Sequence, residues 1–478
     1  MLNTFKACFN VFRPFNLQNR ILLGAFLTVN LLVLLNALLH DPSIGYDALN
    51  HLKYVEVLSH FRLPSPGDSS EFYSPPLPYL FPALLMGTLS LSLWWAGKCA
   101  QLFNVVLSLG LILYLLKTCD LIKPRDSYFK LGTIAFLALL PVYYRTFAFV
   151  RGEPYVAFLA VLVAYHALRL FLFGEQTWFL IVVVGTTLGL LALARQWGFL
   201  LFPPVILLAV VPAIKDRSIL PMRLKALAAT LIISSAVGSW FYLVLFNRYG
   251  SVRAFSGKES PNFALSNQPA SFYFGLASDK LFSDPIRPSF QNKLIPIFYS
   301  ETWGDYWAYF IVYGRDKKTG KMIRGDDLET ALQQQSWPDW LETNRDAITA
   351  YLGRVNLISL FPSTLALAGM ILGTIHVRRL MGSPRVDEEA ALAFLVLIVV
   401  FSLTGYLWFL IKYPLLRNGV TIKATYMLHV FPFIAILAGN ALQSIRRKYR
   451  WIGAAMFAGF ALVFVHNLPA MITRYTSW

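Results

Sequence analysis

Charge is scarce in this chain: 14% of its 478 residues are Asp, Glu, Lys or Arg, whereas 56% are hydrophobic. With a mean hydropathy of +0.55, this composition excludes a soluble globular domain. Cysteine is rarer still, and Cys8, Cys99 and Cys119 show no spacing typical of disulfides or metal sites. N-x-S/T sequons, internal repeats and low-complexity tracts are all missing. These absences leave a polytopic membrane protein without cysteine chemistry.

Long apolar runs are what the sequence has instead. A transmembrane helix needs about 20 apolar residues, and about eleven segments approach this length, some of them interrupted by proline or glycine. They predict an all-α polytopic membrane protein, with external juxtamembrane helices and one larger external segment. The predicted spans are 21–39, 99–116, 131–149, 154–173, 177–194, 199–213, 226–246, 353–375, 390–411, 424–442 and 451–468.

Much of the net charge of +17 is concentrated in short loops between these spans. In a soluble protein it would suggest nucleic acid, but here it indicates topology, because cytoplasmic loops are rich in Lys and Arg. We therefore expect four basic clusters and the N-terminus in the cytoplasm, and no nucleic acid as a partner. The clusters are Lys117, Lys123, Arg125 and Lys130; Lys215, Arg217, Arg223 and Lys225; Arg378, Arg379 and Arg385; and Arg446, Arg447, Lys448 and Arg450.

Residues 75–95 are also apolar enough to span, but counting them would put the later basic clusters opposite the N-terminus. We therefore expect a re-entrant or interfacial helix there, which the prolines of this segment favour. The first apolar run ends at Leu38, Leu39 and His40 without a small-residue cleavage site, which favours a retained anchor over a signal peptide. A first external loop then covers 40–96.

This topology divides the chain into three parts. Residues 1–246 are expected to form a transmembrane module that carries the first external loop. Residues 247–352 form a polar and aromatic external segment, with a short helix expected from Asp326 to Gln335. Residues 353–478 hold the C-terminal transmembrane helices.

The first external loop places ionisable groups at a membrane surface. Asp47, His51 and Glu56 follow the first span, and from Asp47 onward the period predicts an interfacial helix with a polar edge. One interpretation is a functional carboxylate, and the other is an ordinary surface helix that Asp47 caps. Both stay open at this point.

Arg151-Gly152-Glu153 leaves almost no loop between two apolar runs, so Glu153 must lie near the membrane boundary. A carboxylate costs about 2.5–3.5 kcal/mol at the bilayer centre, and less near the edge, unless it has a polar cavity or a partner. Arg151 is the expected partner, and a plain role at a helix N-terminus is the alternative for Glu153. Arg195 lies at the external end of two apolar helices and suits a phosphate oxygen, unless it only snorkels to the interface.

Cations on the external side oppose the positive-inside trend. Lys412, Arg417 and Lys423 lie between two late spans and imply a bound anion or an acidic lipid headgroup. In the external segment, YSETWGDYWAYF surrounds Glu301 and Asp305 with aromatic rings. Sugars favour such a mixture, because rings stack on them and carboxylates accept their hydroxyl hydrogens. An interfacial aromatic belt explains the rings but not the acids.

In their order along most of the chain, these features resemble the GT-C superfamily of membrane glycosyltransferases. This superfamily includes the protein O-mannosyltransferases, the bacterial aminoarabinose transferase and the oligosaccharyltransferases. Its acid of the first external loop matches Asp47, its motif aromatic-x-Pro-Pro-Leu-x-Tyr matches Tyr73 to Tyr79, and its second-loop acid matches Glu153. A basic residue that opens a late helix matches Lys423, with Tyr426 and Pro432 after it.

The resemblance implies roles for individual residues. Asp47 would be the catalytic base or an acceptor-orienting carboxylate, with Glu153 as the second catalytic acid. Arg195 stands where the family has a lysine thought to hold the lipid-linked phosphate, and we expect it to bind the donor phosphate together with Lys423 and Arg417. Support for the acceptor or the active site is expected from His51, Arg151, Tyr79 and Glu301.

Two departures from the family pattern bear on metal dependence. Many members carry Asp-Glu in the first loop, whereas Ala48 follows Asp47 here, and the second-loop acid is Glu instead of Asp. No metal ligand is therefore assigned, and a divalent metal stays open as an alternative.

The function implied is transfer of a sugar from a polyprenyl-phosphate donor to a hydroxyl of a glycan, lipid or protein acceptor. The anomeric configuration would invert, and the active site would face outward from a bacterial plasma membrane, with the N-terminus inside. A secondary transporter or lipid flippase is the rival class, although transporters usually carry internal repeats, which are missing here. A non-catalytic assembly subunit is a third possibility.

Overall fold

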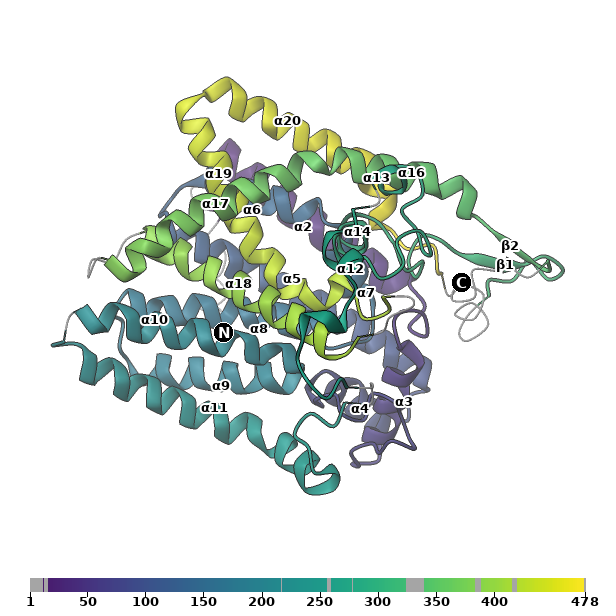
Figure 1. Ribbon diagram of the computed structural model, residues 1–478, viewed down its shortest axis with the longest axis horizontal. Coiled ribbons are helices and arrows are strands. Elements are labelled where there is room, and N and C mark those ends of the chain that lie inside the picture. The colour runs from purple at the N-terminus through teal and green to yellow at the C-terminus, as the bar shows by residue number, and fades with distance from the viewer. Residues whose placement is uncertain are drawn as a thin grey trace.

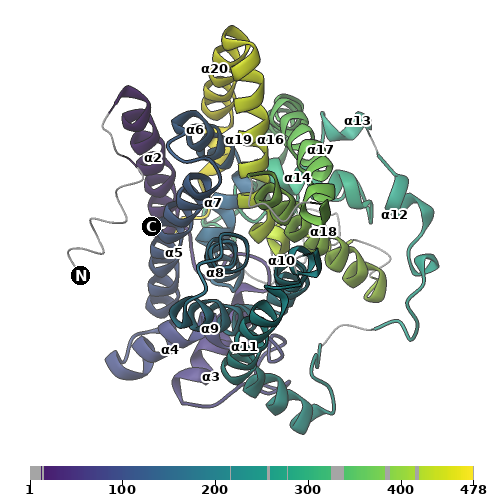
Figure 2. The same cartoon turned by 90° about the vertical axis from the view of Figure 1, so that its left-hand side faces the viewer.

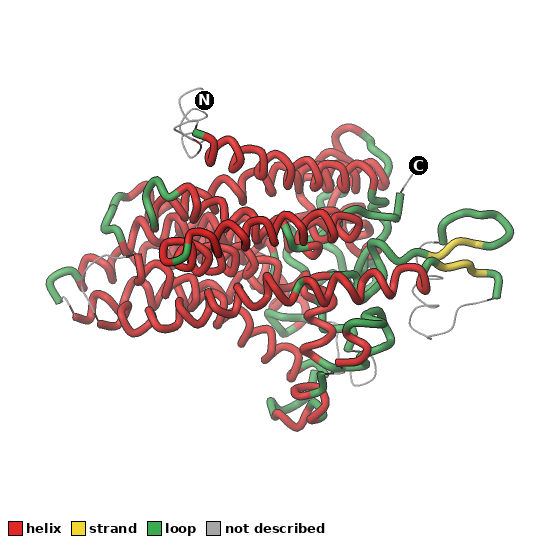
Figure 3. The backbone as a smooth tube through the Cα atoms, turned by 90° about the horizontal axis from the view of Figure 1, so that it is seen from above, coloured by secondary structure: helices red, strands yellow, loops and turns green. Residues whose placement is uncertain are grey.

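The long apolar runs form helices that lie side by side in one bundle (Figure 1). The computed structural model describes residues 12, 16–215, 217–255, 259–276, 278–323, 339–382, 388–414 and 419–476. Helices dominate these residues, and the two strands form one small hairpin at an end of the molecule (Figure 3).

The first half of the chain is helical almost throughout. Its elements are α2 (Leu17–Leu39), α3 (Ala48–Ser59), α4 (Leu77–Leu89), α5 (Leu93–Ile122), α6 (Ser127–Ala138), α7 (Pro141–Ala148), α8 (Glu153–Ala167), η2 (Leu168–Leu172), α9 (Trp178–Ala194), η3 (Gln196–Leu201), α10 (Phe202–Lys215) and α11 (Leu220–Tyr249).

The second half begins with short elements and ends with long helices. Its elements are η4 (Leu265–Asn267), α12 (Ala270–Phe274), α13 (Ser278–Leu281), α14 (Leu294–Trp303), β1 (Gly314–Asp316), β2 (Leu341–Thr343), α16 (Arg345–Ile358), α17 (Leu360–Gly382), α18 (Glu388–Lys412), η5 (Ala424–Val430), α19 (Phe431–Lys448), α20 (Arg450–Asn467) and η6 (Leu468–Met471).

The predicted number of eleven spans is not confirmed. Within the described part of the chain, eight helices are long and apolar enough to cross a membrane, or nine if the pair α6 and α7 is one span. That pair is bent by 65° at Pro141, where the missing N–H ends the helical ladder. The predicted spans 177–194 and 199–213 form shorter apolar helices, Trp178–Ala194 and Gln196–Val211.

Small residues let neighbouring helices approach closely. A Cβ added at Gly238 of α11 would lie 3.0 Å from the carbonyl oxygen of Gly189 on α9, and one at Gly132 of α6 would lie 3.2 Å from Cα of Gly439 on α19. Such contacts drive association of membrane helices, because lipid offers no hydrophobic gain between them. Figure 2 shows α9 beside α11 and α6 beside α19.

Basic clusters meet at one end of the bundle. Lys123 donates to Asn440 Oδ1 at 2.6 Å and lies 3.7 Å from Glu388, and Arg447 donates to Asp126 at 3.1 Å. This same end, on the left of Figure 1, also holds the last residues of α10 and α17 and the first residues of α11 and α18. This arrangement fits a common side for the basic loops, and their cytoplasmic location stays a prediction.

The opposite end carries the loops and short helices. α3, α4 and the hairpin lie there, on the right of Figure 1. α4 has 13 residues, which is too short to cross a bilayer and fits the non-spanning helix expected within 75–95. The C-terminal tail returns to this end, where Thr476 pairs with His40. The helix expected from Asp326 to Gln335 lies outside the described residues.

Candidate active site

Asp47 occupies the junction between the first span and the interfacial helix that the sequence predicts. The predicted helix is confirmed as α3, and Asp47 is its N-cap residue, but the carboxylate makes no capping hydrogen bond. The backbone of Asp47 is left-handed, with a φ of 55°, which costs a non-glycine residue about 1–3 kcal/mol. The capping interpretation is therefore wrong, because the side chain turns to Lys423, whose Nζ is 3.4 Å from Oδ2.

Lys423 is the cation that faces Asp47. It is buried just before η5, and its Nζ lies 4.8 Å from the ring centroid of Tyr46 and 5.5 Å from that of Tyr426. Burial opposes its charge, yet Asp47 and Tyr426 together outweigh burial and the pKa of Lys423 is raised. In return Lys423 lowers the pKa of Asp47, whose side chain remains 42% exposed. Asp47 is thus an ionised carboxylate that a second molecule can reach.

Glu153 and two arginines form a buried ionic group at the start of α8. Nε of Arg151 lies 2.5 Å from Oε2 of Glu153, and Nε of Arg195 lies 3.2 Å from Oε1. The predicted partnership of Arg151 with Glu153 is present, and Arg195 joins it from the end of α9. All three side chains are buried. The catalytic role of Glu153 stays a prediction.

Glu71 completes this group, although the sequence analysis did not select it. Its Oε2 lies 2.9 Å from Nη1 of Arg195 and accepts a hydrogen bond from the Ser74 hydroxyl at 2.5 Å. Burial would raise the pKa of Glu71, but Arg195, His51 and the Ser74 hydroxyl together outweigh it and lower the pKa to about 2. The one signal in the sequence is position, since Glu71 directly precedes the motif that starts at Tyr73.

His51 and Tyr79 lie behind Glu71. The Tyr79 hydroxyl and Nδ1 of His51 form a hydrogen bond of 2.7 Å, and Nδ1 is 4.0 Å from Glu71 Oε2. Burial lowers the pKa of His51 to about 4, so the imidazole is neutral at physiological pH. Tyr79 also stacks on Tyr54, at 4.2 Å between ring centroids. Both side chains are buried beside Glu71, and their expected support of the active site stays a prediction.

Glu301 contacts the site indirectly. It is fully buried on α14, and its Oε1 accepts hydrogen bonds from the Tyr46 hydroxyl and, at 2.8 Å, from Arg145. The Tyr46 side chain therefore lies between Glu301 and Lys423 in space. Arg417 lies outside the described residues, so its expected contact with phosphate stays a prediction.

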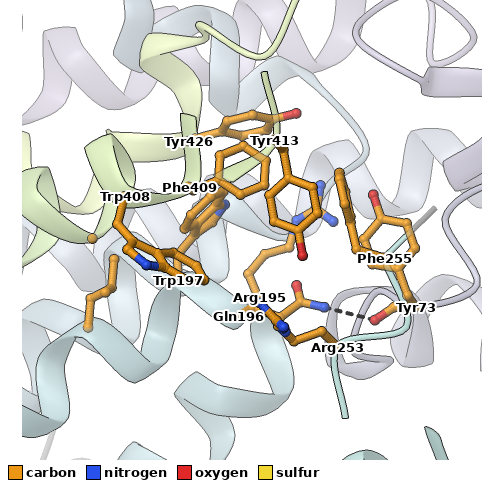
Figure 4. Close-up of a pocket in the computed structure, with 12 residues that line it drawn as sticks. Tyr73, Arg195, Gln196, Trp197, Arg253, Phe255, Trp408, Phe409, Tyr413 and Tyr426 are labelled. Atoms are coloured by element: carbon orange, nitrogen blue, oxygen red, sulfur yellow. Dashed lines mark hydrogen bonds between the residues drawn. The ribbon is translucent and has the colours of Figure 1, made fainter. Parts of the chain in front are cut away.

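A cavity of about 320 Å³ opens beside this group (Figure 4). Arg195 and Tyr426 join it to the ionic residues, and Gln196 donates to the Tyr73 carbonyl at 2.8 Å on its wall. The lining is mainly aromatic and comes from the first loop, η3, α18, the segment after α11, and η5. It consists of Tyr73, Arg195, Gln196, Trp197, Leu200, Arg253, Phe255, Gly405, Trp408, Phe409, Tyr413 and Tyr426.

Of the cations that line the cavity, Arg253 can most readily exchange its carboxylate partner for another anion. The sequence analysis did not predict it as a site residue. It lies 3.1 Å from Glu259, and both side chains are exposed, by 47% and 37%. Exposed pairs of this kind are worth about 0–1 kcal/mol, so an incoming anion can replace Glu259 at little cost. Its guanidinium lies 5.8 Å from the ring centroid of Trp408.

The buried ionic group and the Asp47–Lys423 pair together hold equal numbers of positive and negative charges. Lys423, Arg151 and Arg195 carry three positive charges, and Asp47, Glu153 and Glu71 carry three negative ones, with His51 neutral. An anion that enters must therefore share or displace a carboxylate. The described residues contain no group of three or more His, Cys, Asp or Glu side chains suited to a metal ion.

Comparison with known proteins places these features beside solved membrane structures. A scan against protein-family models gives no match, and a search of curated proteins gives none. ArnT from Cupriavidus metallidurans, bound to undecaprenyl phosphate, is similar over 89% of this chain and 78% of that chain, at 15% identity and a TM-score of 0.37. Its apo state is similar over 88% and 76%, at 15% identity and a TM-score of 0.38.

A third solved structure is the archaeal oligosaccharyltransferase AglB from Archaeoglobus fulgidus, in complex with an inhibitory peptide and a dolichol-phosphate. The likeness covers 95% of this chain but 56% of AglB, at 14% identity and a TM-score of 0.45. These likenesses are distant, and each residue's role below follows from its own contacts.

Proposed function

We propose that this protein transfers a sugar from a polyprenyl-phosphate donor to an acceptor hydroxyl at the external face of the membrane, with inversion at the anomeric carbon. One observation carries the proposal: a half-exposed carboxylate, Asp47, faces a buried lysine beside an aromatic cavity. Such a site offers a base, a cation for a phosphate and stacking surfaces for sugar or isoprene units. It lies at one end of a bundle of apolar helices, where a lipid-linked donor can enter from the bilayer.

Asp47 is the residue best suited to act as the base. Glu153 and Glu71 are both buried against arginines, so neither carboxylate can reach an incoming hydroxyl without breaking an ion pair. Asp47 combines exposure with a single lysine partner at 3.4 Å. We assign Glu153 and Glu71 to holding Arg151 and Arg195 in place.

The leaving phosphate needs cations, because negative charge develops on its oxygens as the bond to the sugar breaks. Among Lys423, Arg151, Arg195 and Arg253, the carboxylate partners of Lys423 and Arg253 are exposed. Arg195 contributes from the cavity wall while it stays paired to Glu153 and Glu71.

The reaction is a direct displacement. The acceptor oxygen bonds to the anomeric carbon, the bond from that carbon to the phosphate oxygen breaks, and the hydroxyl proton passes to Asp47. When the phosphate draws Lys423 away, the influence that lowers the pKa of Asp47 weakens. Donor binding therefore makes Asp47 a better base at the moment when it is needed.

The decisive experiment compares Asp47→Asn with the wild type in transfer of labelled sugar from a panel of synthetic polyprenyl-phosphate sugars to membrane extracts. Asparagine tolerates left-handed backbone, so the variant should fold. We expect transfer to fall by about 100-fold or more, the usual contribution of a positioned base.

Asp68→Asn is the matched control, because Asp68 lies in the same loop and pairs only with exposed Arg62 and with Ser65. It should transfer sugar like the wild type. Full activity of Asp47→Asn would contradict the assignment of the base, and no transfer from any donor by the wild type would contradict the function itself.

A further inference from the structure

Two tyrosines, Tyr46 and Tyr426, each lie beside both Lys423 and Arg151, and Tyr46 is the buried one. The Tyr46 ring lies 4.8 Å from Lys423 Nζ and 5.4 Å from Arg151 Cζ, measured to the ring centroid. Aromatic faces attract cations, more strongly where water is excluded. Phe149 and Tyr309 pack edge-on against the same ring, at 5.6 and 5.1 Å, so its position is well defined.

The far end of Tyr46 leads out of the site to Glu301. The hydroxyl donates to Oε1 of Glu301, which also accepts from Nη2 of Arg145 at 2.8 Å. Arg145 is fully buried as well, and it donates to the carbonyls of Glu301 and Gly304, each at 2.5 Å. The chain Arg145, Glu301, Tyr46 thus runs from α7 through α14 to the first loop.

Burying the Glu301 carboxylate costs free energy that a role in packing alone does not explain. Burial, reinforced by Asp305 and opposed by Arg145, raises the pKa of Glu301 to about 7. Asp305 lies 3.9 Å from Arg145 and accepts the backbone N–H groups of Phe310 and Ile311, so one guanidinium serves two acids. A neutral glutamine could accept the Tyr46 hydroxyl hydrogen without that cost.

We propose that Glu301 and Tyr46 are a positioning pair: ionised Glu301 accepts from the phenol, and the ring so polarised holds Lys423 and Arg151 in place before the donor arrives. A hydrogen bond to an anion adds electron density to the phenol and deepens the negative potential of its face. The inference rests on the proposed function, because these cations are the ones assigned to the donor phosphate and to Glu153. Glu301 acts through Tyr46 and does not touch the substrate.

Double-mutant cycles on the full chain test the pair, with binding of undecaprenyl phosphate as the first measurement. Glu301→Gln and Tyr46→Phe should each weaken affinity about three- to tenfold. The double variant should lose no more than either single one, because both changes break the same link. Tyr144→Phe is the control: it removes a buried hydrogen bond to the Ala138 carbonyl without reaching the site and should bind like the wild type.

The pH dependence separates positioning from packing. Glu301 faces Arg145, Asp305 and Tyr46, and it is ionised above about pH 7. The affinity of the wild type for undecaprenyl phosphate should therefore rise between pH 6 and pH 8. This rise should be larger than the rise for Glu301→Gln, whose affinity changes only because the phosphate itself ionises. Parallel pH curves or independent, additive losses would overturn the proposal.

A second cycle needs no ligand. Tyr46 links Glu301 to Lys423 through its hydroxyl and its ring, so Glu301→Gln should reduce the change in thermal midpoint that Lys423→Met causes, whereas Tyr144→Phe should leave it unchanged. Additive changes in both backgrounds would overturn the positioning pair. If the wild type binds neither undecaprenyl phosphate nor dolichyl phosphate, the proposed function fails, and this cycle still decides whether Glu301 positions Lys423.

Discussion

Arg195 joins two carboxylates because a guanidinium presents its donors in a planar fork. Its Nε lies 3.2 Å from Glu153 and its Nη1 lies 2.9 Å from Glu71, and all three side chains are buried. A buried ion pair contributes little net stability while intact, but removing one partner is costly because the other charge is left unpaired in a dry site. The site thus needs the planar guanidinium of Arg195, and a positive charge alone would not be sufficient.

Arg195→Lys should therefore be poorly tolerated. An ammonium cannot reproduce two separate N–H directions, so we expect a loss of about 3 kcal/mol in stability, seen as a lower thermal midpoint, together with reduced sugar transfer. Arg62→Lys is the control, since Arg62 pairs with Asp68 and is 54% exposed. Equal behaviour of the two variants would contradict a structural role for the Arg195 fork.

Glu71 makes the stability of the protein depend on pH in the acid range. Its folded-state pKa of about 2 lies below the ordinary value of about 4.3, so its contribution to stability is complete above about pH 5 and is lost as the pH falls toward 2. The thermal midpoint of the wild type should fall more steeply on acidification over this range than that of Glu71→Gln. At pH 7 the variant should be less stable by on the order of 3 kcal/mol.

Glu56→Gln provides the comparison, because Glu56 lies in the same loop with an exposed side chain. Its midpoint should follow the wild type at every pH. Parallel curves for Glu71→Gln and the wild type would show that the Glu71 carboxylate is not held by Arg195.

At the scale of elements, the tight turn before α8 presses Glu153 against the end of α9. A Cβ added at Gly152 would lie 2.5 Å from the carbonyl oxygen of Ala194 and 2.7 Å from Cγ of Arg195. The backbone oxygen cannot yield without moving α9, so glycine is required for close approach and not for its φ, which is −81°. The position of Arg195 thus depends on how two helices pack.

Gly152→Ala should displace Arg195 from Glu153. We expect a loss of about 1–3 kcal/mol, the usual cost of overpacking, measured as a lower thermal midpoint, and weaker binding of polyprenyl phosphate. Gly24→Ala is the matched control, because an added Cβ at Gly24 of α2 meets nothing within 4 Å. A Gly152→Ala protein as stable as the control would contradict the close packing of α8 on α9.

The whole molecule has two chemically different ends. Basic clusters and their partners Asp126 and Glu388 lie at one end, and the ionic group around Arg195 lies among the first loop and the ends of α8 and α9 at the other (Figure 1). The positive-inside rule assigns the first end to the cytoplasm. Donor and acceptor would then meet outside.

Cysteine labelling in intact cells tests this orientation in a chain whose three cysteines are replaced by serine. A membrane-impermeant maleimide should label Ser70→Cys directly and Lys448→Cys only after the membrane is opened, since both positions are exposed on opposite ends. The reverse pattern would show that the site faces the cytoplasm.

Composition and hydropathy by themselves determined the class of this protein. The bias of the basic loops predicted the non-spanning proline segment, and periodicity predicted the helix after Asp47. Sequence adjacency selected Arg151 as the partner of Glu153, because these residues are two apart and share one turn. The number of spans was less secure, since proline breaks and short helices such as α9 blur the length criterion.

Tertiary structure alone decided which distant charges meet. Glu71 and Arg195 are 124 residues apart, and Asp47 and Lys423 are 376 apart. Periodicity reports how each residue faces lipid or its own helix neighbours, whereas an ion pair across the bundle depends on how helices pack and how loops fold over them. For this reason the sequence did not predict Glu71, Tyr46 or Arg253 as residues of the site. For the same reason it did not predict that Glu301 acts on the site through Tyr46 and not by direct contact.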